Sequence, residues 1–238
     1  MIRRSLIVLV LAWLCAGCTQ VQLNQTMEKI PGLRDSDLQT HAVQSIKSVT
    51  VKRVAVMPMI ESRDAAQHNT IEPGAAETMS ALVSSEVNLV GGWEATPEDD
   101  VLKVMQQLPP TTRGNMKSNA LSLGRQLSVD AVLYGTVERY KERVGSGYAA
   151  ASPASVAFSL YFIDMRTKAI IWRAQYAKTQ QALSQNVLDV VSFFKHQARW
   201  VRAVDIATHG VRVAIANLHS QLNLLPNVKM FPVGRELK

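Results

Sequence analysis

The residue with the most distinctive chemical setting in this chain is Cys18, which ends the run Cys15-Ala16-Gly17-Cys18. Two arginines, Arg3 and Arg4, and an apolar stretch over residues 6–14 precede it. A basic start, an apolar run too short to span a bilayer and small residues before a cut are the parts of a secretory signal peptide. A cysteine directly after Ala-Gly is typical of a bacterial lipoprotein signal, in which the thiol is acylated and the chain is cut just before it.

An acylated cysteine at this place would determine where the protein acts. A single acyl chain holds a protein only marginally, whereas two or more anchor it stably, at about 0.8 kcal/mol per buried CH₂. Thr19 follows Cys18 in place of the aspartate that often retains lipoproteins at the inner membrane, so we expect the outer membrane and its periplasmic face. Cys15 stands where a leucine is usual, and the alternative is an ordinary secreted protein in which Cys18 is incidental.

Other residues able to bind metals or act as nucleophiles are few and scattered. The chain has two cysteines, one in the signal and one at the lipid attachment site, so the mature domain would have no disulfide, thiol nucleophile or cysteine metal site. The histidines show no HExxH or other metal-ligand spacing; they are His41, His68, His196, His209 and His219. The sequence therefore predicts neither a metal nor a cofactor.

Two short segments contain residue types found in catalytic sites, and each has a structural explanation. Glu98, Asp99 and Asp100 fall in the first turn of a predicted helix, where the helix dipole stabilises acids. Gly145-Ser146-Gly147 lacks the GxSxG nucleophile pattern and joins two predicted strands, which indicates a hairpin loop. We expect a protein that is not an enzyme, while carboxylates that meet only in space leave an envelope hydrolase open.

Length and charge agree with a folded domain outside the cytoplasm. Removal of the 17-residue signal leaves 221 residues, enough for one large domain, and the apolar fraction of 47% is that of a globular protein. Loss of Arg3 and Arg4 lowers the net charge from +7 to +5, a value compatible with an anionic envelope surface and too small to indicate nucleic acid. After Leu14, no apolar run approaches the roughly 20 residues of a membrane helix.

The hydrophobic periodicity predicts alternating strands and helices, then consecutive strands, then helices. Predicted strands cover residues 52–59, 93–95, 131–143, 155–164 and 169–178. Predicted helices cover residues 74–90, 97–108, 117–127, 187–202 and 204–218. The fold class is α/β: a two-layer or three-layer sandwich with a mixed sheet of about five strands in βαβααβββ order and additional C-terminal helices.

These elements divide the chain into four parts. Residues 1–17 form the signal peptide, and residues 18–50 are predicted to be a lipidated N-terminus and tether, because they are polar and lack firm periodicity. Residues 51–180 form the α/β domain. Residues 181–238 are predicted to be a helical extension packed on that domain.

A basic stripe in the C-terminal part is the best candidate for an interaction surface. Lys195, Arg199 and Arg202, with Trp200 beside them, have the spacing of four and three that places cations on one helix face. Such a face could contact anionic lipid or an acidic partner. The alternative is a helix docked by its apolar stripe, with the basic face in water. A second group, Tyr134, Arg139 and Tyr140, either lines a partner groove or packs in the core.

Three segments follow a plan shared with known proteins. Residues 53–58 end a strand at Pro58, residues 127–137 begin the next strand at Asp130 and Ala131 and include Gly135, and residues 162–172 contain the hairpin Asp164-Met165-Arg166-Thr167-Lys168. Over about residues 50–180, the chain resembles the periplasmic lipoproteins that share the fold of the TolB N-terminal domain. That group includes CsgG-like curli secretion proteins and LpoB-like activators of peptidoglycan synthases. Lys168 departs from the plan, because glycine is usual there.

The resemblance implies a structural or regulatory role in the cell envelope. In the CsgG-like pore, hairpins between strands cross the membrane, and each arm needs about 9–11 residues of alternating character. The segment 145–153 is shorter and contains a proline, and the residues after Thr179 read as helix. We therefore expect a lipid-anchored, non-enzymatic assembly or regulatory partner of an envelope complex. A subunit of an oligomeric outer-membrane secretion pore is the alternative, and homo-oligomer formation is open in both.

Overall fold

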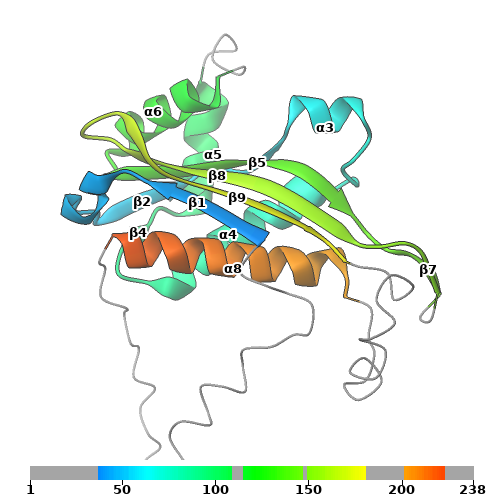
Figure 1. The fold of residues 1–238 in the computed structure, drawn as a ribbon. Coiled ribbons are helices and arrows are strands. Elements are labelled where there is room, and N and C mark those ends of the chain that lie inside the picture. The colour runs from blue at the N-terminus through cyan, green and yellow to red at the C-terminus, as the bar shows by residue number, and fades with distance from the viewer. Residues whose placement is uncertain (1–36, 109–114, 147–148, 181–200, 223–238) are drawn as a thin grey trace, which may run out of the picture. The chain divides into compact units, whose positions relative to one another are not determined.

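The computed structural model describes residues 37–108, 115–146, 149–180 and 201–222 (Figure 1). The chain divides into two units, residues 1–33 and residues 34–238, and every described residue belongs to the second. The signal peptide and most of the predicted helix over residues 187–202 lie outside the described residues.

A seven-stranded mixed sheet is the centre of the described unit. The strand order is β1-β9-β8-β5-β2-β4, and β3 pairs with β5 beyond the end of β2. The pairs β1–β9, β9–β8 and β8–β5 are antiparallel, whereas β2 and β3 pair parallel with β5, and β4 pairs parallel with β2. The strands are β1 (Leu38–Ala42), β2 (Arg53–Val56), β3 (Ile60–Glu61), β4 (Glu94–Ala95), β5 (Ala131–Lys141), β8 (Ser155–Asp164) and β9 (Ala169–Thr179).

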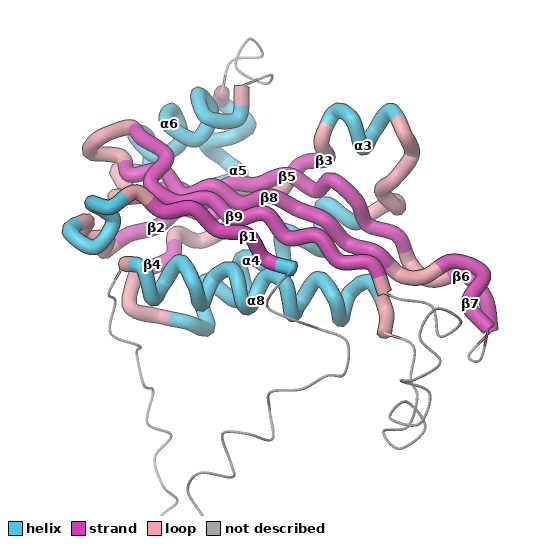
Figure 2. Tube along the Cα trace, in the orientation of Figure 1, coloured by secondary structure: helices cyan, strands magenta, loops and turns pink. Residues whose placement is uncertain are grey.

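Helices cover the sheet on both sides and make three layers (Figures 1 and 2). On one face lie α5 (Glu98–Gln107) and α6 (Met116–Leu127), and on the other lie α4 (Ala75–Val90) and α8 (Ala203–Gln221). A short helix, α3 (Arg63–Gln67), follows β3. The expected α/β sandwich with a mixed sheet is confirmed, and the sheet has seven strands instead of about five.

The side chains alternate between two apolar layers, as the period of a strand requires. Under α5 and α6, one core cluster gathers buried residues from five helices and strands and the residues beside them: Ala55, Met57, Val101, Ala120, Leu123, Val129, Val132, Tyr134 and Ile163. On the opposite face, the aromatic rings of Phe158 and Tyr176 stack at 5.3 Å, and Trp93 contacts both Phe162 and His219 of α8. The Trp172 indole Nε1 donates to the Asn217 side chain of α8 at 3.0 Å. The C-terminal helix is therefore part of the core.

Part of the predicted tether belongs to the sheet. Residues 38–42 form β1, which pairs along its length with β9, and residues 44–48 form a 3-10 helix, η2 (Gln44–Ser48), with Ile46 buried. The prediction of a tether up to residue 50 is wrong for this stretch. Its alternation is weak because β1 lies at the sheet edge and only its ends are half-buried, so the sequence carries little periodic signal.

The segment between β5 and β8 is also more regular than predicted. Two short strands, β6 (Val144–Ser146) and β7 (Ala149–Ser152), form a separate two-stranded ribbon that extends beyond the large sheet (Figure 2). The hairpin connection was expected here, whereas its strand pairing was not. Within the described residues, no helix has both the length and the apolar character needed to span a membrane.

The close contact between α8 and the sheet depends on Gly210. A Cβ atom at this position would lie 2.6 Å from the ring of Tyr176, whose side chain is 1% exposed and cannot move aside. Glycine is about 1 kcal/mol poorer than alanine in a helix interior, so its presence here reflects packing and not helix propensity.

We expect Gly210→Ala to destabilise the protein by about 1–3 kcal/mol, because overpacking against Tyr176 exceeds the gain in helix propensity. Urea unfolding followed by circular dichroism would measure this. Ala216→Ser, an exposed position on the same helix, is the matched control with little effect. An increase in stability for Gly210→Ala would show that α8 does not approach the sheet this closely.

Candidate functional site

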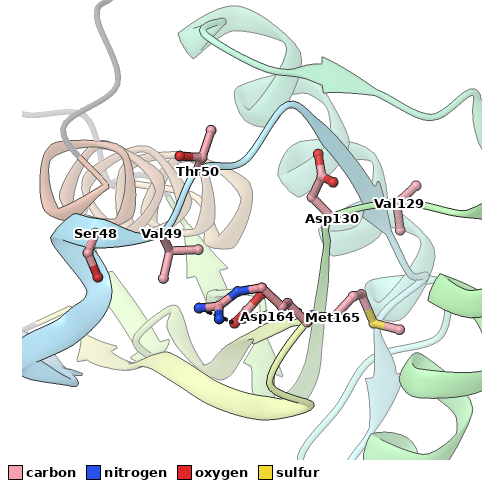
Figure 3. A pocket seen from close by; sticks show the side chains of 8 residues that line it. Ser48, Val49, Thr50, Val129, Asp130, Asp164 and Met165 are labelled. Carbon is pink, nitrogen blue, oxygen red and sulfur yellow. Dashed lines mark hydrogen bonds and ion pairs between the residues drawn. The ribbon is translucent and has the colours of Figure 1, made fainter.

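Two segments of the sequence plan shared with known proteins, residues 127–137 and 162–172, meet at one end of the sheet. They border an open cavity of about 520 Å³ (Figure 3). Three segments contribute to it: the loop after η2, the start of β5 and the turn between β8 and β9. The lining residues are Ser48, Val49, Thr50, Val129, Asp130, Asp164, Met165 and Arg166. Two carboxylates and two hydroxyl groups make this the first place to look for chemistry.

Asp130 holds the start of β2 beside the start of β5. One carboxylate oxygen accepts hydrogen bonds from the backbone N–H groups of Lys52 and Arg53, both at 2.9 Å. The guanidinium group of Arg53 donates to the carbonyl oxygen of Ser128, just before β5. Burial raises the pKa of Asp130, but the hydrogen bonds from Arg53 and Lys52 and the charges of these residues outweigh it and hold the pKa below its usual range.

Asp164 shapes the turn between β8 and β9. Its carboxylate is 3% exposed and accepts from the backbone N–H groups of Arg166 and Thr167 and from the Thr167 hydroxyl, the last at 2.7 Å. Lys168 then adopts φ 58°, the left-handed conformation that explains why glycine is usual at this position. The Met165 N–H donates to the Asp130 carbonyl at 2.9 Å, which ties the turn to β5.

Gly135, the glycine of the shared sequence plan, is explained by a contact with the neighbouring strand. A Cβ atom at Gly135 would lie 2.5 Å from the backbone carbonyl oxygen of Ser159 on β8, and a backbone atom cannot move away cheaply. The shared residues of the cavity and of β5 therefore fix strand starts, a tight turn and a close strand pair. The lowered pKa of Asp130 makes its carboxylate a poor proton acceptor at neutral pH, and the Asp164 carboxylate holds the turn, so the cavity favours a structural role.

A second polar cluster, which the sequence did not predict, holds the start of α8. The Glu142 carboxylate accepts from the backbone N–H of Ala203, the first residue of the helix, at 3.0 and 3.1 Å. The Glu72 carboxylate in turn accepts from the N–H of Glu142 at 2.7 Å. A carboxylate at the N-terminus of a helix is stabilised by the helix dipole and by unpaired N–H groups. Nothing in the sequence spacing links residues 61 positions apart, so this contact required the structure.

Of the predicted interaction residues, only one can be placed. Cys18, Lys195, Arg199 and Trp200 lie outside the described residues. Arg202 directly precedes α8, and its guanidinium group pairs with Asp205 at 3.4 Å on an exposed surface. The Asp205 carboxylate also accepts from the backbone N–H of Arg202 at 3.1 Å, so this residue pair caps the helix.

The predicted tyrosine group separates into different surroundings. Tyr134 is 6% exposed and stacks on Tyr161 at 5.1 Å beneath the helices of the first core, and burial raises its pKa to about 12. Tyr140 is 8% exposed and faces the start of α8, where burial and the charges of Glu142 and Glu72 raise its pKa. Arg139 lies on the opposite face of β5 from Tyr140. The two tyrosines therefore pack, and the three residues do not line one groove.

The described histidines lie in separate places and do not assemble a site. His41 is exposed on β1, His68 ends α3 and contacts the Asp64 carbonyl at 2.8 Å, and His209 and His219 belong to α8. Burial lowers the pKa of His219, whose ring meets Trp93 edge-on. Among the described residues, no three His, Cys, Asp or Glu side chains come together as metal ligands would. Glu98, Asp99 and Asp100 are exposed in the first turn of α5, as predicted.

The described residues form a three-layer α/β domain. At one end of its sheet, Asp130 and Asp164 hold strand starts and a turn in place, and the C-terminal helix α8 packs on one face. No family model matches the chain, and no curated protein matches it. Among solved structures, the chain is similar to the PelC dodecamer from Paraburkholderia phytofirmans, with 14% identity and a TM-score of 0.45 over 76% of this chain and 95% of that chain.

Two further structures have a similar chain path. Lipoprotein GNA1162 from Neisseria meningitidis is 18% identical, with a TM-score of 0.40 over 61% of this chain and 96% of that chain. The LpoB C-terminal domain from Salmonella enterica is 20% identical, with a TM-score of 0.37 over 59% of this chain and 96% of that chain. All three TM-scores are below 0.5.

The lowered pKa of Asp130 leads to a pH-dependent prediction. Because the folded pKa is below the unfolded value, the charged carboxylate stabilises the fold above the unfolded pKa, and this contribution is lost as the pH falls through the folded pKa. We expect Asp130→Asn to destabilise the protein by about 1 kcal/mol at pH 7 and by less near pH 3. Urea unfolding at both pH values would test this. Asp99→Asn, at an exposed helix start, is the control, and an equal loss at both pH values would contradict the prediction.

Proposed function

We propose that this chain is a lipid-anchored lipoprotein of the bacterial outer membrane that faces the periplasm and acts, without catalysis, as an assembly or regulatory partner of a cell-envelope complex. The observation that carries the proposal is Cys18, placed directly after Ala16-Gly17 and a short apolar run with a basic start. A permanent anchor at one end of a folded domain suits a protein whose task is to meet another envelope component.

The chemistry of the described domain supports a binding role. Asp130 and Asp164, the carboxylates of the open cavity, are engaged by backbone N–H donors and hold strands and a turn in place. The buried tyrosines pack in the core, with the pKa of Tyr134 raised to about 12 by burial. Groups in such surroundings serve stability, and a partner protein would meet the domain at its exposed side chains.

The anchor is tested by the fate of the cysteine. We expect Cys18→Ser to abolish incorporation of a palmitate analogue and to prevent the cut before residue 18, because both steps act on the thiol-bearing residue. Metabolic labelling and mass spectrometry of the N-terminal peptide would show this. Cys15→Ser is the matched control, since residues before the cut are removed. Continued acylation of Cys18→Ser would overturn the lipoprotein assignment.

The partner is tested by crosslinking in cells with the lipidated, full-length protein. We expect a dominant heterologous crosslink to one envelope component, identified by mass spectrometry, which is reduced when the Cys18→Ser protein is expressed at the same level. A ladder of self-crosslinks without a heterologous species would contradict the proposal and favour a subunit of an oligomeric secretion pore.

A further inference from the structure

We propose that a basic row on the uncovered half of the sheet, formed by Arg139, Lys141 and Arg143, binds an extended acidic segment of a partner protein. This inference rests on the proposed function, because it names the surface and the chemistry by which the domain would hold its envelope partner.

The register of the sheet places Arg139 and Lys141 of the row on the face opposite α8. Arg139 pairs with Ala157 of β8, and Lys141 pairs with Ser155. The neighbours of these two small residues on β9 are Ala177 and Thr179. The intervening residues, such as Val156 and Tyr140, point toward α8 because side chains alternate along a strand. Arg139 and Lys141 therefore border a floor of small side chains, and Arg143 continues the spacing of two along the chain.

The helices of the first core leave this floor open. Helices α5 and α6 lie over β2, the first half of β5 and the end of β8, where Val132, Tyr134 and Ile163 are buried against them. At the other half of the sheet, Gln175, Ala177 and Thr179 of β9 are exposed. Val144, directly after the basic row, is a 60% exposed apolar residue. This combination of small, apolar and basic groups is a surface that α5 and α6 do not cover.

The cations of the row lack acceptors within the described part of the chain. None of the ion pairs formed there includes Arg139, Lys141 or Arg143. The Nε atom of Arg139 and one terminal nitrogen of Arg143 are buried without a hydrogen-bond partner. Buried donors are nearly always satisfied in folded proteins, so one nitrogen in each of these two guanidinium groups is short of an acceptor, which we assign to the partner segment. Glu138, the neighbouring carboxylate, accepts from the Ser159 hydroxyl and is already engaged.

The spacing of the row indicates the shape of that acceptor. Arg139 and Lys141 are two apart on β5, and residues two apart on a strand lie about 6.5–7 Å from each other, which is also the repeat of side chains on one side of an extended peptide. Carboxylates at alternate positions of an extended segment can therefore meet successive cations, and Arg binds carboxylates through two parallel hydrogen bonds. Val144 can cover an apolar residue of the same segment.

The test uses the full-length, lipidated protein in neutral-lipid nanodiscs and a fluorescent ten-residue peptide of alternating Glu and Thr. We expect fluorescence anisotropy to show binding that weakens as salt rises, and no binding of the Gln-Thr peptide of the same length. Arg139→Gln/Arg143→Gln should weaken binding at least about tenfold. The affinity of Arg139→Lys/Arg143→Lys for the peptide should lie between those of the wild-type protein and the Gln variant, because the charge remains while the planar guanidinium group is lost.

The matched control is Lys103→Gln/Lys117→Gln, which removes the same charge from exposed positions on α5 and α6 and should leave binding unchanged. Equal loss in the control, or no peptide binding by the wild-type protein, would overturn the proposal. Phosphatidylglycerol vesicles are a second probe, applied to the Cys18→Ser protein. Vesicle binding that depends on Arg139 and Arg143 while the peptide fails to bind would overturn it in favour of a lipid surface.

The crosslinking experiment separates failure of this surface from failure of the proposed function. If Arg139→Gln/Arg143→Gln retains the heterologous crosslink of the wild-type protein, the partner exists and the basic row does not bind it. If the wild-type protein binds the acidic peptide but captures no partner in cells, the proposed function fails instead. A crosslink lost in this variant and retained in Lys103→Gln/Lys117→Gln would support both.

Discussion

The burial of β8 on both faces is the constraint on which the rest of the domain depends. Nine of its ten residues are buried, and the remaining residue, Tyr161, is half-buried. A strand without a solvent-facing side needs cover above and below, as in sheets enclosed by helices. On one side α4 and α8 provide that cover, which is why the C-terminal helix contributes Ile206, Val211 and Ile215 to the core.

On the other side the cover is incomplete, and the strand compensates through residue size. Next to α5 and α6, the buried side chain of β8 is large, as at Ile163. Farther along the same face of β8 the residues are Ser159, Ala157 and Ser155, which are at most 7% exposed. Small side chains are readily shielded by their neighbours on adjacent strands, so this half of the sheet stays buried without cover from α5 and α6. The open face is thus a consequence of the same burial that forms the core.

The sequence predicted the parts of this structure whose signals are local. The period of two from Val156 to Ile163 and the apolar stripe of residues 74–90 gave strands and a helix close to their observed bounds. Asp130, Gly135 and Asp164 were recognised as structural motif residues, and hydrogen bonds or close backbone contacts explain each of them. Strand β1 was missed because an edge strand with exposed side chains lacks alternation.

Contacts between distant residues could not be predicted in the same way. Glu142 and the start of α8 are far apart in sequence, and neither has a pattern that names the other. The basic row, unlike the Glu142 contact, is visible in the sequence, because Arg139, Lys141 and Arg143 stand at alternate positions. A single such row is usually a solvated strand face. Its meaning depends on whether a helix covers it, and that is a property of the whole sheet.

The polar groups around the open cavity and those on the open face differ in how their hydrogen bonds are satisfied. Around the open cavity, Asp130 and Asp164 each accept two or more hydrogen bonds, chiefly from backbone N–H groups. On the open face, one guanidinium nitrogen of Arg139 and one of Arg143 are buried without an acceptor. An unmet donor costs about 1–3 kcal/mol, which a carboxylate from outside would recover on binding. Interior atoms such as the Tyr176 hydroxyl and Asn119 Oδ1 also lack a partner, so what distinguishes Arg139 and Arg143 is their positive charge and their place beside the exposed residues of β9, where we propose that a partner docks.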